Sequence, residues 1–172
     1  MSTRNLVRAT AQYIYAAVRM NLEQALRRHR RCMAADAYVR ILTSDPLLSL
    51  PGAIEELIGT TVGGDDDGDG DDARLSAASL DPKADQIRAR VCMLLRRAIH
   101  LAVAGATMAD RMGRGGRRRR GEEGAPLPER RHALADDVGA WTVEHVTQLI
   151  QDSAECMLGE LEHRCRREQV WE

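Results

Sequence analysis

The sequence predicts an all-α protein, folded as a compact bundle of six to eight helices around one central hydrophobic helix. Apolar residues recur every three to four positions along most of the chain, which is the spacing of one helix face. No segment alternates with the period of two that is typical of strands. Aromatic residues make up 3% of the chain and Phe is absent. Leu, Ala, Val, Ile and Met must therefore fill the core, a composition that suits helices better than sheets.

Length and composition predict a single domain over residues 1–172. The net charge of −1 points to no class of partner. No apolar stretch reaches the length of a membrane span, and the N-terminus carries no signal-peptide pattern. We therefore expect a soluble intracellular protein with no membrane partner. The four cysteines (Cys32, Cys92, Cys156 and Cys165) are widely spaced, and we expect them to be reduced thiols.

Start and stop residues divide the chain into helices. Asp45-Pro46 and Asp81-Pro82 each offer an N-cap followed by Pro at the first helical position. Gly59 and Gly139 are expected to end helices. The expected helices cover residues 5–28, 33–43, 51–58, 82–112 (with a break near Arg97), 128–138 and 141–167.

The first helix has an unusually wide apolar arc. One side carries Leu6, Ala9, Tyr13, Ala16 and Met20. A helix buried deep in its own domain would explain the arc, and so would burial of the second side against another subunit. For the second case we predict a protein interface made of Val7, Ala11, Tyr15, Val18 and Leu22.

The segment at residues 98–109 is apolar or small almost all round, which predicts a central helix surrounded by others. It contains His100, which we expect to be buried and hydrogen-bonded.

Two charged, glycine-rich stretches are expected to be mobile loops: an acidic loop at residues 63–72 and a basic loop at residues 111–124. The acidic loop resembles a calcium-binding loop at Asp65, Asp67, Asp69 and Gly70. Ser76 occupies the position of the bidentate Glu, however, so we expect a solvated insertion instead. The basic loop offers a phosphate-binding cluster (Arg114, Arg117, Arg118, Arg119 and Arg120) and an alternative function in binding nucleic acid. It holds no aromatic residue to stack on a base, which argues against sequence-specific binding of single strands.

The sequence shows no motif of an enzyme. No nucleophile turn, phosphate-binding loop or dinucleotide fingerprint is present. Cys156, His163 and Cys165 have the atoms for zinc, but on one helix they point in different directions. We therefore expect no catalytic residues, no cofactor and no metal.

Three stretches together resemble the poxviral Bcl-2-like proteins. Gln12-Tyr13-Ile14-Tyr15 opens the first helix, HRRCMAADAYVRILTS at residues 29–44 carries Cys32 and Tyr38, and IHLAVAGATMADRMG at residues 99–113 is an apolar helix closed by Met112-Gly113. The resemblance implies a helical bundle with a buried central hairpin. It also implies a viral virulence factor in the host cytoplasm. Independently of the resemblance, the Arg-rich loop offers a nuclear address and thus a nuclear fraction as an alternative. Such proteins suppress innate immune signalling of the NF-κB type by binding a host signalling adaptor or kinase, and several form homodimers through a face that includes the first helix.

Other members of that family inhibit apoptosis by holding the death-motif helix of a pro-apoptotic protein in a hydrophobic groove. These members carry an Asn-Trp-Gly-Arg-like motif at the start of a central helix. Here the comparable pair, Gly113-Arg114, follows the end of a helix, and no membrane anchor follows Glu172. Both departures favour the signalling function, with the inhibition of apoptosis as the alternative. A helical scaffold protein with no viral role is a further alternative.

Overall fold

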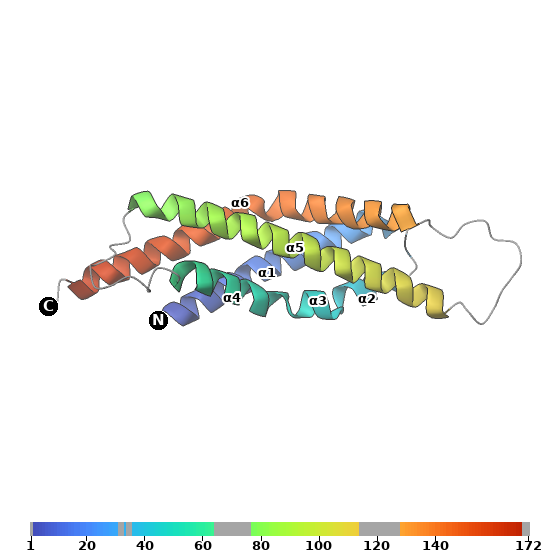
Figure 1. The fold of residues 1–172 in the computed structure, drawn as a ribbon, viewed down its shortest axis with the longest axis horizontal. Helices are drawn as coiled ribbons and strands as arrows, with labels where there is room; N and C mark the ends of the chain where they lie inside the picture. Colours follow the sequence, from blue (N-terminus) through green and yellow to red (C-terminus); the bar gives the residue numbers. More distant parts are fainter. Residues whose placement is uncertain (1, 31–32, 34–35, 64–76, 114–127, 170–172) are drawn as a thin grey trace, which may run out of the picture. The chain divides into compact units, whose positions relative to one another are not determined.

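Helices account for all the regular structure of the described residues. The computed structural model describes residues 2–30, 33, 36–63, 77–113 and 128–169. Within these ranges there is no strand, and the elements in chain order are α1 (Thr3–Arg28), α2 (Ala37–Leu42), α3 (Asp45–Leu48), α4 (Leu50–Gly63), α5 (Ala77–Gly113) and α6 (Pro128–Gln169) (Figure 1). The all-α prediction is confirmed, and the number of helices in the described part of the chain lies within the predicted six to eight.

The helices are distributed over two compact units. Unit 1 consists of residues 1–17, 51–93 and 146–172, and unit 2 of residues 18–50 and 94–145. The three longest helices, α1, α5 and α6, therefore contribute residues to both units. α4 belongs to unit 1 except for its first residue, whereas α2 and α3 belong to unit 2.

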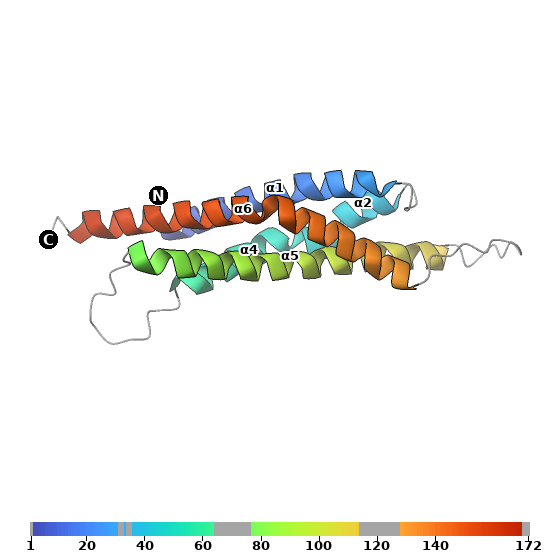
Figure 2. The same ribbon diagram turned by 90° about the horizontal axis from the view of Figure 1, so that it is seen from above.

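Unit 1 has a core of aliphatic side chains. Its segments of α1, α4, α5 and α6 lie alongside one another (Figures 1 and 2). The buried apolar residues include Val7, Ala11, Ile14, Ile54, Ile58, Ala84, Ile87, Val91, Val146, Ile150, Ala154, Met157, Leu158 and Leu161. They recur at steps of three and four along each helix, as one buried helix face requires. No aromatic side chain is among the buried residues of the described chain, which confirms the composition expected for the core.

Unit 2 is built in the same way. Its core includes Val18, Leu22, Ala25, Leu26, Ala37, Ile41, Leu42, Leu47, Leu50, Leu95, Ala98, Ile99, Ala102, Val103, Ala106, Ala135, Val138 and Val143. The short helix α3 begins after Ser44, which adopts the extended conformation of an N-cap residue. The predicted N-cap Asp45 is instead the first helical residue, and Pro46 is the second.

Several predicted helix boundaries are wrong. α4 continues past Gly59 to Gly63, α6 runs without a stop through Gly139, and α5 has no break at Arg97. α5 also begins at Ala77, so Pro82 lies inside the helix and not at its start. A glycine inside a helix costs about 1 kcal/mol relative to Ala. Burying one large aliphatic side chain contributes about 1.5–3 kcal/mol. Val138 and Val143 flank Gly139 in the sequence, and both are buried. Their packing outweighs the cost of the glycine.

The second half of α5 is not surrounded by other helices, contrary to our expectation. Leu101 is 50% exposed and Met108 is 60% exposed, while Leu95, Ile99 and Val103 are buried on the other face. His100 is only half-buried. α5 is therefore an amphipathic helix whose outer face carries apolar side chains, and the small residues in this segment misled the prediction.

The predicted charged loops fall mostly on residues 64–76 and 114–127, outside the described residues. Their described ends are helical, because Gly63 belongs to α4 and residues 111–113 belong to α5. The four Asp and Gly positions of the calcium-like pattern and the Arg cluster at residues 114 and 117–120 also lie outside the described residues.

Candidate functional site

A groove with a volume of about 580 Å³ lies in unit 1, between the first turns of α1 and one face of α4. α1 contributes one wall and α4 contributes the other. The lining residues are Thr3, Arg4 and Val7 of α1, and Gly52, Glu55, Glu56, Gly59, Val62 and Gly63 of α4. Because all of them belong to unit 1, the groove is a feature of that unit alone.

The α4 wall owes its hollow shape to glycines. Gly52, Gly59 and Gly63 are separated by steps of seven and four residues, which places them on one face of the helix. A Cβ atom added at any of the three would meet no other atom within 4 Å. A Cβ atom would therefore fit there without a clash, and a larger side chain on this face would project into the groove.

The opposite face of α4 holds the helix in place. Ile54 and Ile58 are completely buried in the core of unit 1. Thr61 is buried as well, and its Oγ1 donates a hydrogen bond to the Leu57 carbonyl at 2.8 Å. The same oxygen lies 3.4 Å from Nη1 of Arg90, which donates to it from α5. This packing keeps α4 helical past Gly59 and positions the glycine face.

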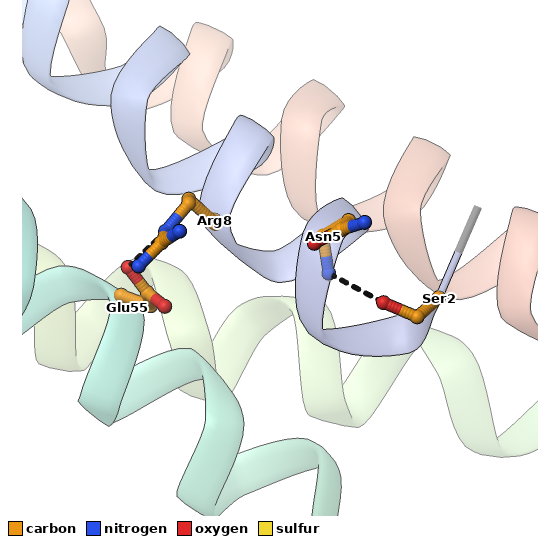
Figure 3. Close-up of polar contacts among 4 residues, drawn as sticks. All are labelled: Ser2, Asn5, Arg8 and Glu55. Carbon is orange, nitrogen blue, oxygen red and sulfur yellow. Dashed lines mark hydrogen bonds and ion pairs between the residues drawn. The ribbon is translucent and has the colours of Figure 1, made fainter.

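The α1 wall is positioned by the start of the helix. The Ser2 hydroxyl oxygen accepts a hydrogen bond from the Asn5 backbone N–H at 3.3 Å (Figure 3). The Ser2 carbonyl accepts one from the Leu6 backbone N–H at 3.1 Å. A serine in this position satisfies a backbone donor that the first turn leaves unpaired. The first turn is thereby ordered next to α4, and it carries the three lining residues of α1.

Charged side chains stand on both walls. Nε of Arg8 donates to Oε2 of Glu55 at 3.4 Å, so this carboxylate is neutralised across the two helices (Figure 3). Arg4 and Glu56 are exposed lining residues, and within the described chain neither forms an ion pair. The groove thus has an apolar lining from Val7 and Val62. Among the described residues, the Arg4 guanidinium on the α1 wall and the Glu56 carboxylate on the α4 wall have no ion-pair partner.

The predicted interface on the first helix lies inside the chain. Val7, Ala11, Val18 and Leu22 are each at most 5% exposed, and Tyr15 is half-buried. The structure divides these residues between the cores of unit 1 and unit 2 and does not bring them together as one exposed surface. The exposed side of α1 is the other one, where Ala9, Tyr13, Ala16 and Met20 are exposed. The wide apolar arc hid this outcome, because periodicity alone does not tell which side of such a helix faces the core.

Unit 2 contains a polar cluster between α5 and α6. Nδ1 of His132 lies 3.1 Å from Nε2 of His100, and the two rings are stacked with centroids 5.0 Å apart. Nδ1 of His100 lies 3.9 Å from Oδ1 of Asp136. His100 is therefore not the buried core histidine that we expected, although it does have hydrogen-bonding partners.

Unit 2 also contains an aromatic cluster around Trp141. Its ring stacks on His145, with centroids 3.9 Å apart, and the Arg28 guanidinium lies 4.8 Å from the ring centroid. The Trp141 carbonyl is also 2.8 Å from Nδ1 of His145. Stacking and cation–π contacts of this kind stabilise packing between helices.

Sequence reasoning did not find the groove. Its signal was the spacing of Gly52, Gly59 and Gly63, but Gly59 was interpreted as a helix stop. Among the described residues, no group of three or more His, Cys, Asp or Glu side chains is arranged to hold a metal ion. None of the described helices combines the length and apolar character needed to cross a membrane.

Comparisons with known proteins find no relative. No family model matches the chain, and neither a curated protein nor a solved structure is significantly similar to it.

Proposed function

We propose that this chain is a non-enzymatic protein that acts by binding another protein, and that the groove between α1 and α4 receives a helix of the partner. The observation that carries the proposal is the groove itself, with its floor of Val7, Val62 and glycine backbone. Its volume of about 580 Å³ lies within the range of roughly 300–1,000 Å³ found for small-molecule sites, so it can also receive several side chains of a partner.

The dimensions of the groove suit a helix. Gly63 follows Gly52 by 11 residues, which corresponds to about 16 Å or three turns of α4. A partner helix can approach the α4 backbone closely there, because three of the lining residues have no side chain. Capture of an amphipathic helix in an apolar groove is a common mode of protein recognition.

In its most specific form, the proposal is a viral Bcl-2-like virulence factor that suppresses host NF-κB signalling. The partner is then a host signalling adaptor or kinase in the cytoplasm. The sequence resemblance at residues 12–15, 29–44 and 99–113 supports this form, and the all-α fold is compatible with it.

An NF-κB reporter assay in cytokine-stimulated mammalian cells tests this function. Wild-type protein should inhibit the reporter in a dose-dependent way without loss of viability. Gly59→Leu should abolish the inhibition, because the new side chain occupies the groove. Gly105→Leu is the matched control: Gly105 is also an exposed helical glycine with open space around its Cβ position, but it does not line the groove. Absence of inhibition by well-expressed wild-type protein would contradict the signalling function.

The groove also supports a second candidate, an inhibitor of apoptosis that binds the death-motif helix of a pro-apoptotic protein. Fluorescence anisotropy with a labelled pro-apoptotic peptide distinguishes the two. Saturable binding that Gly59→Leu removes and Gly105→Leu preserves, together with an unaffected NF-κB reporter, would replace the first function with the second.

A further inference from the structure

The two walls of the groove carry opposite charges that no described residue neutralises. Arg4 lies on the α1 wall and Glu56 on the α4 wall, and within the described chain neither forms an ion pair. Glu55, in contrast, is already paired with Arg8. A ligand in the groove therefore has a cation on one side and an anion on the other.

We infer that the groove selects an amphipathic helix with an apolar stripe, an acidic residue on the flank that faces α1 and a basic residue on the flank that faces α4. The inference rests on the proposed function, since it specifies the chemistry of the partner for the same groove. The apolar stripe covers Val7, Val62 and the glycine face, and the flanking charges pair with Arg4 and Glu56.

The geometry follows that of helix pairs in coiled coils. There, apolar residues form the seam, and the positions beside the seam carry charges that choose the partner and its orientation. A helix with two acidic flanks would place a carboxylate beside Glu56. A helix with two basic flanks would place a cation beside Arg4. Like charges at such positions disfavour binding, so only mixed flanks satisfy both walls.

The test uses three libraries of stapled helical peptides of about 14 residues, slightly longer than the groove. All three have the same randomised apolar stripe. The first has one acidic and one basic flank, the second has two acidic flanks and the third has two basic flanks. Peptides selected on the wild-type protein are then measured by fluorescence anisotropy. We expect the best peptides with mixed flanks to bind about tenfold more tightly than the others, from two exposed ion pairs of modest strength.

Charge-reversal variants make the test specific. Glu56→Arg leaves both walls positive, so the best binders should come from the doubly acidic library. Arg4→Glu leaves both walls negative, so they should come from the doubly basic library. Both residues are exposed and have no ion-pair partner in the part of the chain that the structure describes, so we expect both variants to fold. Glu144→Arg is the matched control, because it reverses an exposed carboxylate of α6 outside the groove and should leave the preference for mixed flanks unchanged.

The outcomes separate this inference from the proposed function. If no library yields a binder, or if binding survives Gly59→Leu, helix capture in the groove is wrong. If binders are sensitive to Gly59→Leu but come equally from all three libraries, the groove captures helices and the inferred charge selection is wrong. A preference for mixed flanks that follows the two charge reversals supports the inference.

Discussion

Nε of Arg8 lies 3.4 Å from Oε2 of Glu55, and this ion pair joins α1 to α4 beside the groove (Figure 3). The Arg8 side chain is 62% exposed and that of Glu55 is 25% exposed. Water and salt screen a pair in this position, so its contribution to stability is small. The groove walls are held by the core residues behind them, such as Ile54 and Ile58, and the ion pair mainly removes one charge from the α4 wall.

A double-mutant cycle measures the strength of this pair. We expect Arg8→Ala and Glu55→Ala to show a coupling free energy of less than about 1 kcal/mol at low salt, decreasing as salt is added. Urea denaturation of the wild type, both single variants and the double variant provides the four values. A coupling above about 2 kcal/mol that is insensitive to salt would show that the contact is structurally important.

Two similar substitutions on opposite faces of α5 should change the free energy of unfolding by very different amounts. Leu95 is completely buried in unit 2, so Leu95→Ala should reduce the free energy of unfolding by about 2–5 kcal/mol. Leu101 is 50% exposed, so Leu101→Ala should change it by no more than about 0.5 kcal/mol. Thermal or urea unfolding followed by circular dichroism compares them. Equal losses for both variants would mean that this segment is surrounded after all.

The two sides of α1 provide a test of self-association. Val18 is 1% exposed, so Val18→Asp should unfold the protein or destabilise it by several kcal/mol, because it buries an unpaired charge. Met20 is 58% exposed, so Met20→Asp should leave the helical circular dichroism spectrum unchanged. If the wild type is a dimer in light scattering and Met20→Asp is a folded monomer, the exposed side of α1 is its interface. A folded Val18→Asp variant would contradict the burial of that side.

Periodicity predicted most of the fold because it reports directly on burial. The apolar residues that recur at helical spacing along α6, including Val146, Ile150 and Met157, are completely or almost completely buried. Where apolar or small residues occur on all sides of a helix, the hydrophobic periodicity does not indicate which face is buried. For α1, periodicity therefore left open which side faces the core, and for the second half of α5 it predicted burial all round.

The sequence alone did not predict where the helices end or where the groove lies. Both depend on tertiary packing. A glycine lowers helix stability locally, but whether the helix ends there depends on what its neighbours bury. Gly59 and Gly139 are both inside helices because residues such as Ile58 and Val138 pack into a core. The groove depends on the same tertiary information: Gly52, Gly59 and Gly63 become a wall only when α1 lies beside them.

The glycines of α4 predict a conflict between stability and function. The Cβ of an alanine at position 59 would meet no atom within 4 Å, so Gly59→Ala should stabilise the helix by about 1 kcal/mol through its better helix propensity. The same gain is expected for Gly105→Ala, which has equally open surroundings on α5. Thermal unfolding measures both gains.

Because the methyl group at position 59 also enters the groove, Gly59→Ala should weaken binding of the groove-selected peptides, whereas Gly105→Ala should not. Stabilisation of both variants with a loss of binding only for Gly59→Ala would show that Gly59 lowers helix stability but allows the close approach of a partner. A loss of stability on Gly59→Ala would instead mean that the backbone at this position needs glycine for the fold.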